Sequence, residues 1–220
     1  MGKFFVFEGI DGSGKTTLSK LVANKLEAPP NIEIIWHREP TDGAYGKQIR
    51  NFLTGRITLT KTEQMELFLK DRHQSVTEVI RPNITKGNIV IQDRYIYSTA
   101  AYQGGNEFTC EEILLKNEEQ GFPKPNLVFF IDLTPEEARE RRVARGGKKE
   151  YFDEDSSQNL IYQNYMKLME AEILSAQAET DLQNRKELQA KSKDLLLQIM
   201  NEPIASALDK RVQKLLADET

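Results

Sequence analysis

Cysteine and histidine are almost missing from this sequence. Its 220 residues include one cysteine, Cys110, and two histidines, His37 and His73. A lone cysteine excludes an intrachain disulfide and is typical of a reducing compartment, so we expect a cytoplasmic location. One cysteine and two separated histidines also supply too few ligands for a structural zinc site.

Long apolar runs and a strong excess of one charge are missing too. No hydrophobic stretch approaches the roughly 20 residues that span a bilayer, and no signal-peptide pattern precedes the first apolar run. The 30 lysines and arginines against 34 acidic residues give a net charge of −4, which argues against nonspecific nucleic-acid binding. We therefore expect neither a membrane nor a nucleic acid as partner, whereas local basic clusters favour small anionic ligands.

Short apolar runs alternate with helical patterns along the chain. Four nearly continuous runs predict strands covered on both faces, at residues 4–7, 32–36, 88–92 and 127–131. Capping patterns predict helix starts at Thr60, Thr109 and Thr134, and the helix from Thr60 is expected to stop or kink near Pro82. The alternation predicts an α/β fold with a parallel sheet of four or five strands flanked by helices.

The most specific pattern is a glycine-rich loop directly after the first apolar run. Residues 9–16 fit G-x-x-x-x-G-K-T, with a predicted strand before them and an amphipathic helix after them. Glycines let the backbone wrap a phosphate, and successive N–H groups form an anion nest at the helix N-terminus. Lys15 is expected to reach the terminal phosphates, and the Thr16 hydroxyl to ligate magnesium. The loop predicts nucleoside triphosphate binding by Gly9, Ile10, Asp11, Gly12, Ser13, Gly14, Lys15, Thr16 and Thr17.

An acid and an arginine follow the third predicted strand. Asp93 and Arg94 stand at the carboxyl edge of the predicted sheet, where α/β proteins place their ligands. Asp93 can hold magnesium through water, and Arg94 can clamp a phosphate in bidentate fashion. An isolated pair of this kind is more often a surface ion pair, but a phosphate loop nearby favours the phosphate-binding interpretation.

Over residues 3–170 the chain resembles the thymidylate kinases of the bacterial type. The matching motifs are, in chain order, residues 7–17, Arg38-Glu39-Pro40, residues 67–72 and residues 93–104. The resemblance implies a P-loop nucleoside monophosphate kinase fold in one domain over residues 1–220. Within it we expect a mobile lid at about 141–157 and an atypical helical segment at about 158–220. The implied activity is phosphoryl transfer from ATP, with Mg²⁺, to dTMP, giving dTDP and ADP in a homodimeric enzyme.

The resemblance also implies an acceptor site for dTMP. Its base would be bound by Phe68, which stacks on thymine, and by Arg72, Thr99 and Gln103. Its phosphate would be held by Arg38 and Arg94, whereas Asp11 would meet the 3′-hydroxyl and Tyr102 would crowd the 2′ position. Without the resemblance, the pattern around Phe68 is more typical of a core aromatic.

The same resemblance implies that catalytic charge comes from the lid. Gly12 occupies the phosphate-loop position where one subgroup of the family has a catalytic arginine. In the other subgroup the lid supplies that charge, and this chain resembles it, with Arg141 and Arg145 at matching positions. The predicted catalytic residues are Lys15, Arg38, Arg94, Arg141 and Arg145. A solvated basic helix face is the alternative for one or two of the lid arginines.

Several alternatives remain open at this point. A GTP-driven switch needs an Asn-Lys-x-Asp motif, and the nearest match, at residues 24–27, ends in glutamate. A kinase for another deoxynucleotide or nucleoside, or a nucleotide-binding protein without catalysis, fits the phosphate loop equally well. Residues 195–200 are either a fifth strand or the end of a long helix, and single-sequence rules do not separate the two.

Overall fold

The computed structural model describes residues 2–146 and 151–179. The chain divides into two units, of which the first ends at Glu170, and the fold described below belongs to that first unit. Residues 195–200 lie outside the described residues. The domain boundaries expected from the sequence therefore stay predictions.

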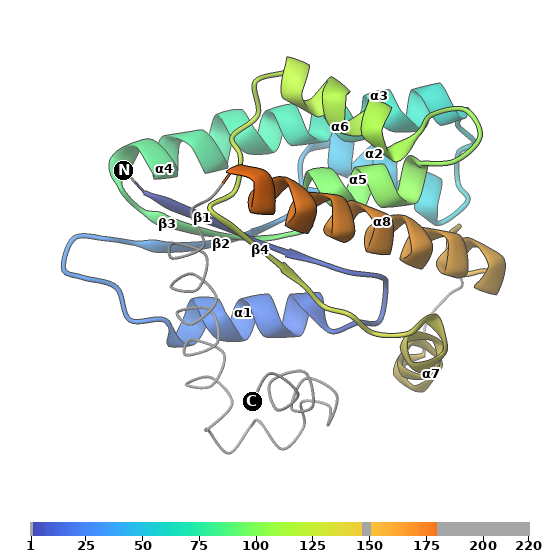
Figure 1. Ribbon diagram of the computed structural model, residues 1–220, viewed down its shortest axis with the longest axis horizontal. Coiled ribbons are helices and arrows are strands. Elements are labelled where there is room, and N and C mark those ends of the chain that lie inside the picture. The colour runs from blue at the N-terminus through green and yellow to red at the C-terminus, as the bar shows by residue number, and fades with distance from the viewer. Residues whose placement is uncertain (1, 147–150, 180–220) are drawn as a thin grey trace. The chain divides into compact units, whose positions relative to one another are not determined.

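A four-stranded parallel sheet forms the centre of the first unit (Figure 1). Its strands are β1 (Lys3–Glu8), β2 (Ile34–Arg38), β3 (Ile89–Asp93) and β4 (Leu127–Phe130), in the spatial order β2-β3-β1-β4. The four predicted strands and the parallel α/β class are thus confirmed. Because β1 is an inner strand, the phosphate loop that follows it emerges between the ends of β3 and β4.

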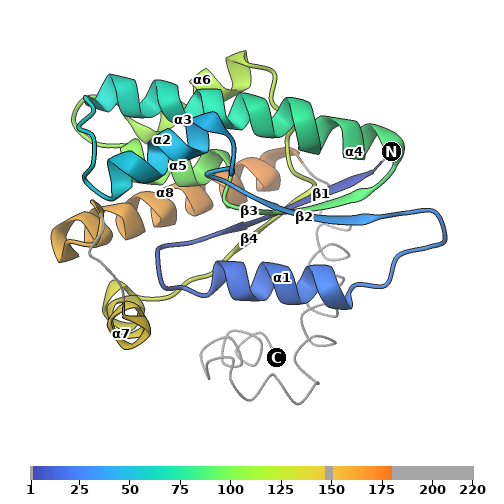
Figure 2. The same cartoon turned by 180° about the vertical axis from the view of Figure 1, so that it is seen from behind.

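Helices cover both faces of this sheet (Figures 1 and 2). They are α1 (Lys15–Lys25), α2 (Ala44–Leu53), α3 (Lys61–Ser75), the π-helix η1 (Val76–Ile80), α4 (Arg81–Lys86), α5 (Ile96–Gln103), α6 (Cys110–Glu119), α7 (Pro135–Arg145) and α8 (Asp155–Glu179). α1 lies on one face, and α3, α4 and α5 lie on the other, with α2 and α6 packed outside them. No helix in the described part combines the length and apolar content needed to cross a membrane.

The sheet is buried from both sides, as the continuous apolar runs predicted. On one face Val6 and Val90, both 0% exposed, pack with Val76 and Ile80 of η1. On the other, the rings of Phe7 and Phe129 stack with centroids 4.8 Å apart. Burial of such side chains, at roughly 1.5–3 kcal/mol each, fixes the strands whose ends carry the polar residues discussed below.

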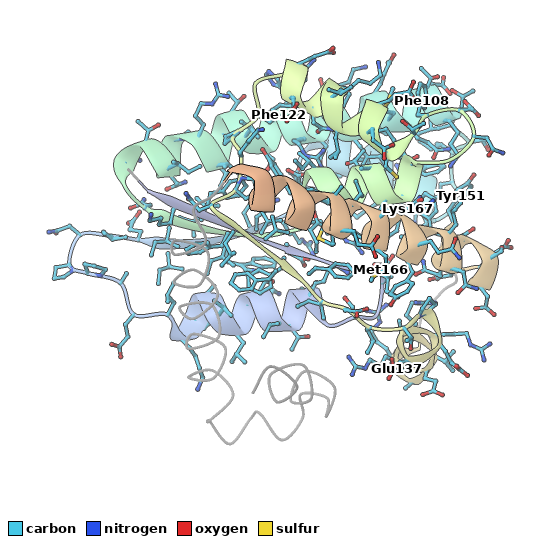
Figure 3. The ribbon with its side chains drawn as sticks, viewed as in Figure 1. Phe108, Phe122, Glu137, Tyr151, Met166 and Lys167 are labelled. Carbon is cyan, nitrogen blue, oxygen red and sulfur yellow. The ribbon has the colours of Figure 1, made fainter. Side chains whose placement is uncertain are left out.

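All three predicted capping boxes are present. Thr60, Thr109 and Thr134 each accept a hydrogen bond from the backbone N–H three residues later, and the glutamate there reaches back to the threonine. Glu137, which completes the box of α7, is labelled in Figure 3. These boxes satisfy the free N–H groups of three helix starts and fix where α3, α6 and α7 begin.

One expected helix boundary is refined by the structure and a second needs correction. The α-helix α3 ends at Ser75, and the chain passes through the π-helix η1 into α4, whose first turn holds Pro82. Regular α-helical hydrogen bonding thus stops before the proline, which lacks an N–H, while the chain stays helical across it. The loop expected up to residue 157 ends earlier, since α8 begins at Asp155, whose carboxylate suits a helix N-terminus.

Candidate functional site

The glycine-rich loop has the backbone that its sequence predicts. Gly9, Gly12 and Gly14 have φ values of 145°, 91° and 99°, which L side chains rarely adopt. Gly12 also lies against α7, because a Cβ added to it would stand 2.5 Å from the carbonyl oxygen of Ala138. Glycine is therefore required at position 12 both by its φ and by the close approach of α7.

Lys15 is folded over this loop. Its side chain is 5% exposed, its Nζ donates to the Ile10 carbonyl at 2.8 Å, and the Asp11 carboxylate lies 4.0 Å away. Burial and the neighbouring Arg94 guanidinium lower the pKa of Lys15 to about 8, although Asp11 opposes this shift. The lysine is thus a partly desolvated cation, which an incoming anion would stabilise in its charged form. Of the other predicted loop residues, Ser13 is buried and Thr17 is exposed.

Thr16, in the first turn of α1, contacts Asp93, the last residue of β3. The Thr16 hydroxyl donates to Oδ2 of Asp93, and the other carboxylate oxygen, Oδ1, is buried without a partner among the described residues. A hydroxyl and a carboxylate with a spare oxygen are hard ligands suited to Mg²⁺ that keeps water and phosphate oxygens. The described residues contain no cluster of three or more acidic, histidine or cysteine ligands, so a dedicated protein cage for a metal is not what they form.

Arg94 lies directly across the loop from Lys15. Its backbone is left-handed, with φ 69°, and its N–H donates to the Phe7 carbonyl at 3.0 Å. Its guanidinium pairs with Asp11, donates at 3.2 Å to both Ser98 Oγ and the Tyr102 hydroxyl, and stands 4.9 Å from the Tyr102 ring centroid. Burial raises the pKa of Asp11, but Arg94 and Lys15 lower it more, to about 2. Asp11 is thus a fixed anion between two cations.

Arg38 lies at the same edge of the sheet but does not point to this cluster. It ends β2 in register with Asp93, and its half-exposed guanidinium pairs with Asp42 at 3.2 Å. Asp42 also pairs with Arg50 of α2 at 3.3 Å, and Arg50 donates to the Pro40 carbonyl. Arg50 was not among the predicted site residues, because α2 itself was not predicted.

Arg72 is wholly enclosed by polar partners. It is 1% exposed and donates to Glu39 from Nε at 3.0 Å and from Nη2 at 2.7 Å, to Asn117 at 2.7 Å, and to Thr99 Oγ1 at 3.0 Å. Burial raises the pKa of Glu39 to about 7, although Arg72 counteracts the shift. Nη1 has two hydrogens, and Asn117 takes one of them, so a second remains for a ligand.

Gln103 and Phe68 differ from ordinary core residues. The Gln103 side chain is 3% exposed, yet neither its Oε1 nor its Nε2 has a partner among the described residues. A buried amide of this kind is expensive unless something else completes its hydrogen bonds. Phe68 is partly exposed although Met65 and Leu67 beside it are buried.

Arg142, rather than Arg145, is the arginine of α7 that the structure brings deepest into the loop. Its Nη1 donates to the Asp11 carbonyl at 2.6 Å, and its Nε lies 3.4 Å from Asp153 Oδ1. Arg141 donates to the Ser13 carbonyl at 3.4 Å, whereas Arg145 is exposed. Ala138, one helical turn before Arg142, is buried against Gly12, but no sequence signal singled it out from Val143 and Ala144 of the same helix, which are exposed.

A cavity of about 530 Å³ lies beside these groups. It is bordered by the end of α2, the start of α3 and residues 151–157, with Lys61, Tyr151 and Phe152 among its lining. Phe152 of its lining also packs edge-on against Tyr102, the partner of Arg94, with ring centroids 5.2 Å apart. Figure 3 places Tyr151 near the amino-terminal end of α8.

Known proteins that are similar to this chain belong to one family. The model of the family described as thymidylate kinase matches residues 7–188. The thymidylate kinase of Leptospira borgpetersenii is 42% identical over 171 residues, which cover 78% of this chain and 83% of that protein. A probable thymidylate kinase of Pyrococcus abyssi is 37% identical over 174 residues, covering 77% and 83% of the two chains. The solved thymidylate kinase of Candida albicans superposes with a TM-score of 0.64 at 28% identity, covering 76% of this chain and 77% of the other.

Replacing Gly12 by alanine tests the contact between the loop and α7. Gly55 is the matched control, because its φ is also positive, at 71°, but nothing lies within 4 Å of its added Cβ. We expect Gly55→Ala to lower the free energy of unfolding by about 1 kcal/mol through strain alone. Gly12→Ala should cost about 1–3 kcal/mol more, because the Cβ collides with Ala138. Urea denaturation measures both, and equal losses would contradict the contact.

Proposed function

The chain belongs to the thymidylate kinase family, and from this we propose that it transfers the γ-phosphoryl group of ATP to dTMP, giving dTDP and ADP. Its fold is the P-loop nucleoside monophosphate kinase fold. The observation that carries the proposal is the pairing of a phosphate loop with Arg94, whose guanidinium lies across Asp11 from Lys15.

The reaction needs positive charge beside the two phosphates and does not need a general base. The second pKa of a phosphate monoester is near 6, so the attacking oxygen of dTMP is largely ionised at pH 7. The obstacle is repulsion, since two unit charges about 4 Å apart cost roughly 4 kcal/mol at an effective dielectric near 20. We propose that Lys15 meets the ATP phosphates while Arg94 meets the dTMP phosphate, so that both are neutralised and aligned in line.

Arg38 completes the acceptor-phosphate site in this proposal. Its guanidinium is bound to Asp42, an exposed pair, and exposed ion pairs are worth at most about 1 kcal/mol. A dianionic phosphate would compete easily for such a weakly held guanidinium. Arg38 would then move from Asp42 toward the ligand, while Arg50 keeps Asp42 paired.

The base of dTMP is proposed to lie between Phe68 and the buried amide of Gln103. The unpartnered Gln103 side chain supports this, because thymine offers both a donor at N3 and flanking carbonyl acceptors. Arg72 would give its remaining Nη1 hydrogen to a thymine carbonyl, while Thr99 helps to hold Arg72 in place. Tyr102, fixed by Arg94, would border the sugar and disfavour a 2′-hydroxyl.

We also propose that Thr16 and Asp93 hold a Mg²⁺ ion, the latter through water, as their chemistry and the spare Asp93 oxygen suggest. When bound, this ion would neutralise charge on the ATP phosphates.

Arg141, predicted as a lid arginine, lies beside the phosphate loop and would bind the triphosphate there. We propose the same role for Arg142, which the sequence did not predict. The role of Arg145, the homodimer, the cytoplasmic location and the lack of nucleic-acid partners stay predictions of the sequence.

An ADP-release assay across dTMP, dUMP, UMP, CMP, AMP and GMP tests the proposed function. We expect dTMP to be the best substrate and dUMP to be about 10- to 200-fold poorer, since a missing methyl is worth about 1–3 kcal/mol. Turnover of another nucleotide above dTMP would favour the rival kinase, and binding of ATP without any turnover would favour a nucleotide-binding protein.

Phe68→Ala should raise the KM for dTMP about 5- to 100-fold with little change in the KM for ATP, because stacking on a base is worth about 1–3 kcal/mol. Phe122→Ala is the control, since Phe122 is also partly buried but precedes β4, at the amino ends of the strands (Figure 3). Steady-state kinetics measure both variants. Unchanged KM values for Phe68→Ala would make Phe68 a packing residue.

ATP binding should be accompanied by proton uptake near pH 8. The pKa of Lys15 is about 8 without ligand, and phosphate groups would raise it, so the complex gains protons that the free protein has partly lost. At pH 8 the expected uptake is about half a proton, measured calorimetrically in buffers of different ionisation enthalpy. Lys15→Arg removes this uptake, because arginine stays protonated. The same uptake in both proteins would assign it to another group.

A further inference from the structure

The Glu8 carboxylate is completely buried and has no role in the mechanism above. It ends β1, is 0% exposed and stands beside the phosphate loop. Both of its oxygens accept hydrogen bonds, Oε1 from two backbone N–H groups and Oε2 from two hydroxyls. This is the pattern of an ionised carboxylate, which has acceptors only. A buried charge that is so fully bonded holds its partners in fixed places.

The first pair of bonds fixes the backbone next to Arg94. Oε1 accepts from the N–H of Tyr95 at 2.8 Å and from that of Ser98 at 3.2 Å. These groups belong to the start of α5, so the carboxylate of a strand residue caps this helix from across the fold. Because Arg94 immediately precedes the cap with its φ of 69°, the cap also stabilises that uncommon backbone.

The second pair of bonds fixes the Arg94 side chain. Ser98 Oγ donates to Glu8 Oε2 at 2.5 Å and accepts from Arg94 Nη1 at 3.2 Å. A serine hydroxyl has one hydrogen, and Glu8 takes it. The lone pairs of Ser98 are therefore turned toward the guanidinium, so that Ser98 is held as an acceptor for Arg94.

Tyr165, on α8, contacts both Glu8 and Ser98. Its hydroxyl lies 2.9 Å from Glu8 Oε2 and 2.8 Å from Ser98 Oγ. Its ring packs edge-on against Tyr102, with centroids 6.4 Å apart, and Tyr102 in turn accepts from Arg94 Nη2. Glu8 of β1 and Tyr165 of α8 thus support Ser98 and Tyr102 of α5, which bind the Arg94 guanidinium directly.

We propose that Glu8, acting through Ser98 and Tyr165, is a positioning residue that presets the Arg94 guanidinium for the acceptor phosphate. The inference rests on the proposed function for the identity of that phosphate. Ser98 holds Nη1 from behind, while Nη2 faces Asp11. A phosphate can replace Asp11 at Nη2 without rotation of the guanidinium, so little ordering remains to be done on binding.

A double-mutant cycle on dTMP affinity tests the coupling. Ser98→Ala removes the acceptor but leaves the bonds of Glu8 to the two backbone N–H groups. We expect it to weaken dTMP binding about 3- to 10-fold in titration calorimetry, with ATP affinity unchanged. In the Arg94→Ala background Ser98→Ala should have no further effect, because Ser98 acts through Arg94. The same fold-loss in both backgrounds would overturn the inference.

Matched variants separate positioning from simple loss of stability. Ser19 is a buried serine that accepts from Trp36 on α1's side of the sheet, so Ser19→Ala should leave dTMP affinity unchanged. Ser98→Thr keeps a hydroxyl and should restore affinity, and Tyr165→Phe should cause a smaller, about 2-fold, loss. Loss of dTMP affinity in Ser19→Ala equal to that in Ser98→Ala would assign the effect to stability alone.

A readout without substrate keeps the inference testable if the proposed function fails. In the unliganded full chain, side-chain nitrogen NMR should show restricted rotation of the Arg94 guanidinium in wild type and Ser19→Ala, with the signals assigned by Arg94→Lys. Ser98→Ala should release this rotation. Unchanged signals in Ser98→Ala would overturn the positioning role, whereas an immobile Arg94 in a wild-type protein that does not bind dTMP would overturn only the function.

Discussion

Lys15 and Arg94 place two positive charges in one buried space, and a single carboxylate, Asp11, lies between them. Arg94 and Lys15 lower the pKa of Asp11 to about 2 against the effect of burial. Burial, together with Arg94, lowers the pKa of Lys15 to about 8, although Asp11, Asp93 and Glu8 oppose the shift. A phosphate group beside Lys15 would stabilise its charged form. The glycine-rich loop, the left-handed backbone of Arg94 and the buried Glu8 are the means by which the fold keeps these charges together in the absence of a ligand.

The register of the sheet brings these charges together. Phe7 of β1 pairs with Asp93 of β3, so the next residue of each, Glu8 at the end of β1 and Arg94 just after β3, lie side by side. Arg38, the last residue of β2, is in register with Asp93 on the other side of β3, so a further arginine stands at the same edge of the sheet. A shift of one residue along β3 would turn Asp93 away from Thr16, since neighbouring residues on a strand face opposite sides. Apolar burial of Val6 and Val90 is therefore what holds the register on which the polar site depends.

The part of this site that sequence reasoning predicted consists of local patterns. The phosphate loop, the strand ends and the capping boxes each lie within a few residues, and glycine, proline and threonine have strong local preferences there. The parts that it missed are pairings between distant residues, such as Tyr165 with Glu8, 157 positions apart, and Arg142 with Asp11, 131 apart. No periodicity marks such pairs, because each partner alone fits an ordinary helix or strand. Arg141 and Arg145 are both exposed, so the catalytic role of Arg145 stays a prediction of the sequence.

The proposed base site, with Arg72 and Gln103, predicts how selectivity would divide between shape and hydrogen bonding. Arg72 offers only donors, and its fixed partners leave it no freedom to turn. A base that presents an amino group where thymine has a carbonyl would leave both that amino group and the guanidinium unpaired in a buried place, which a polar site rejects strongly. A base that merely lacks the methyl loses only its apolar contact. If thymine binds as proposed, the buried polar geometry around Arg72 and Gln103 would therefore separate thymine from cytosine far better than it separates thymine from uracil.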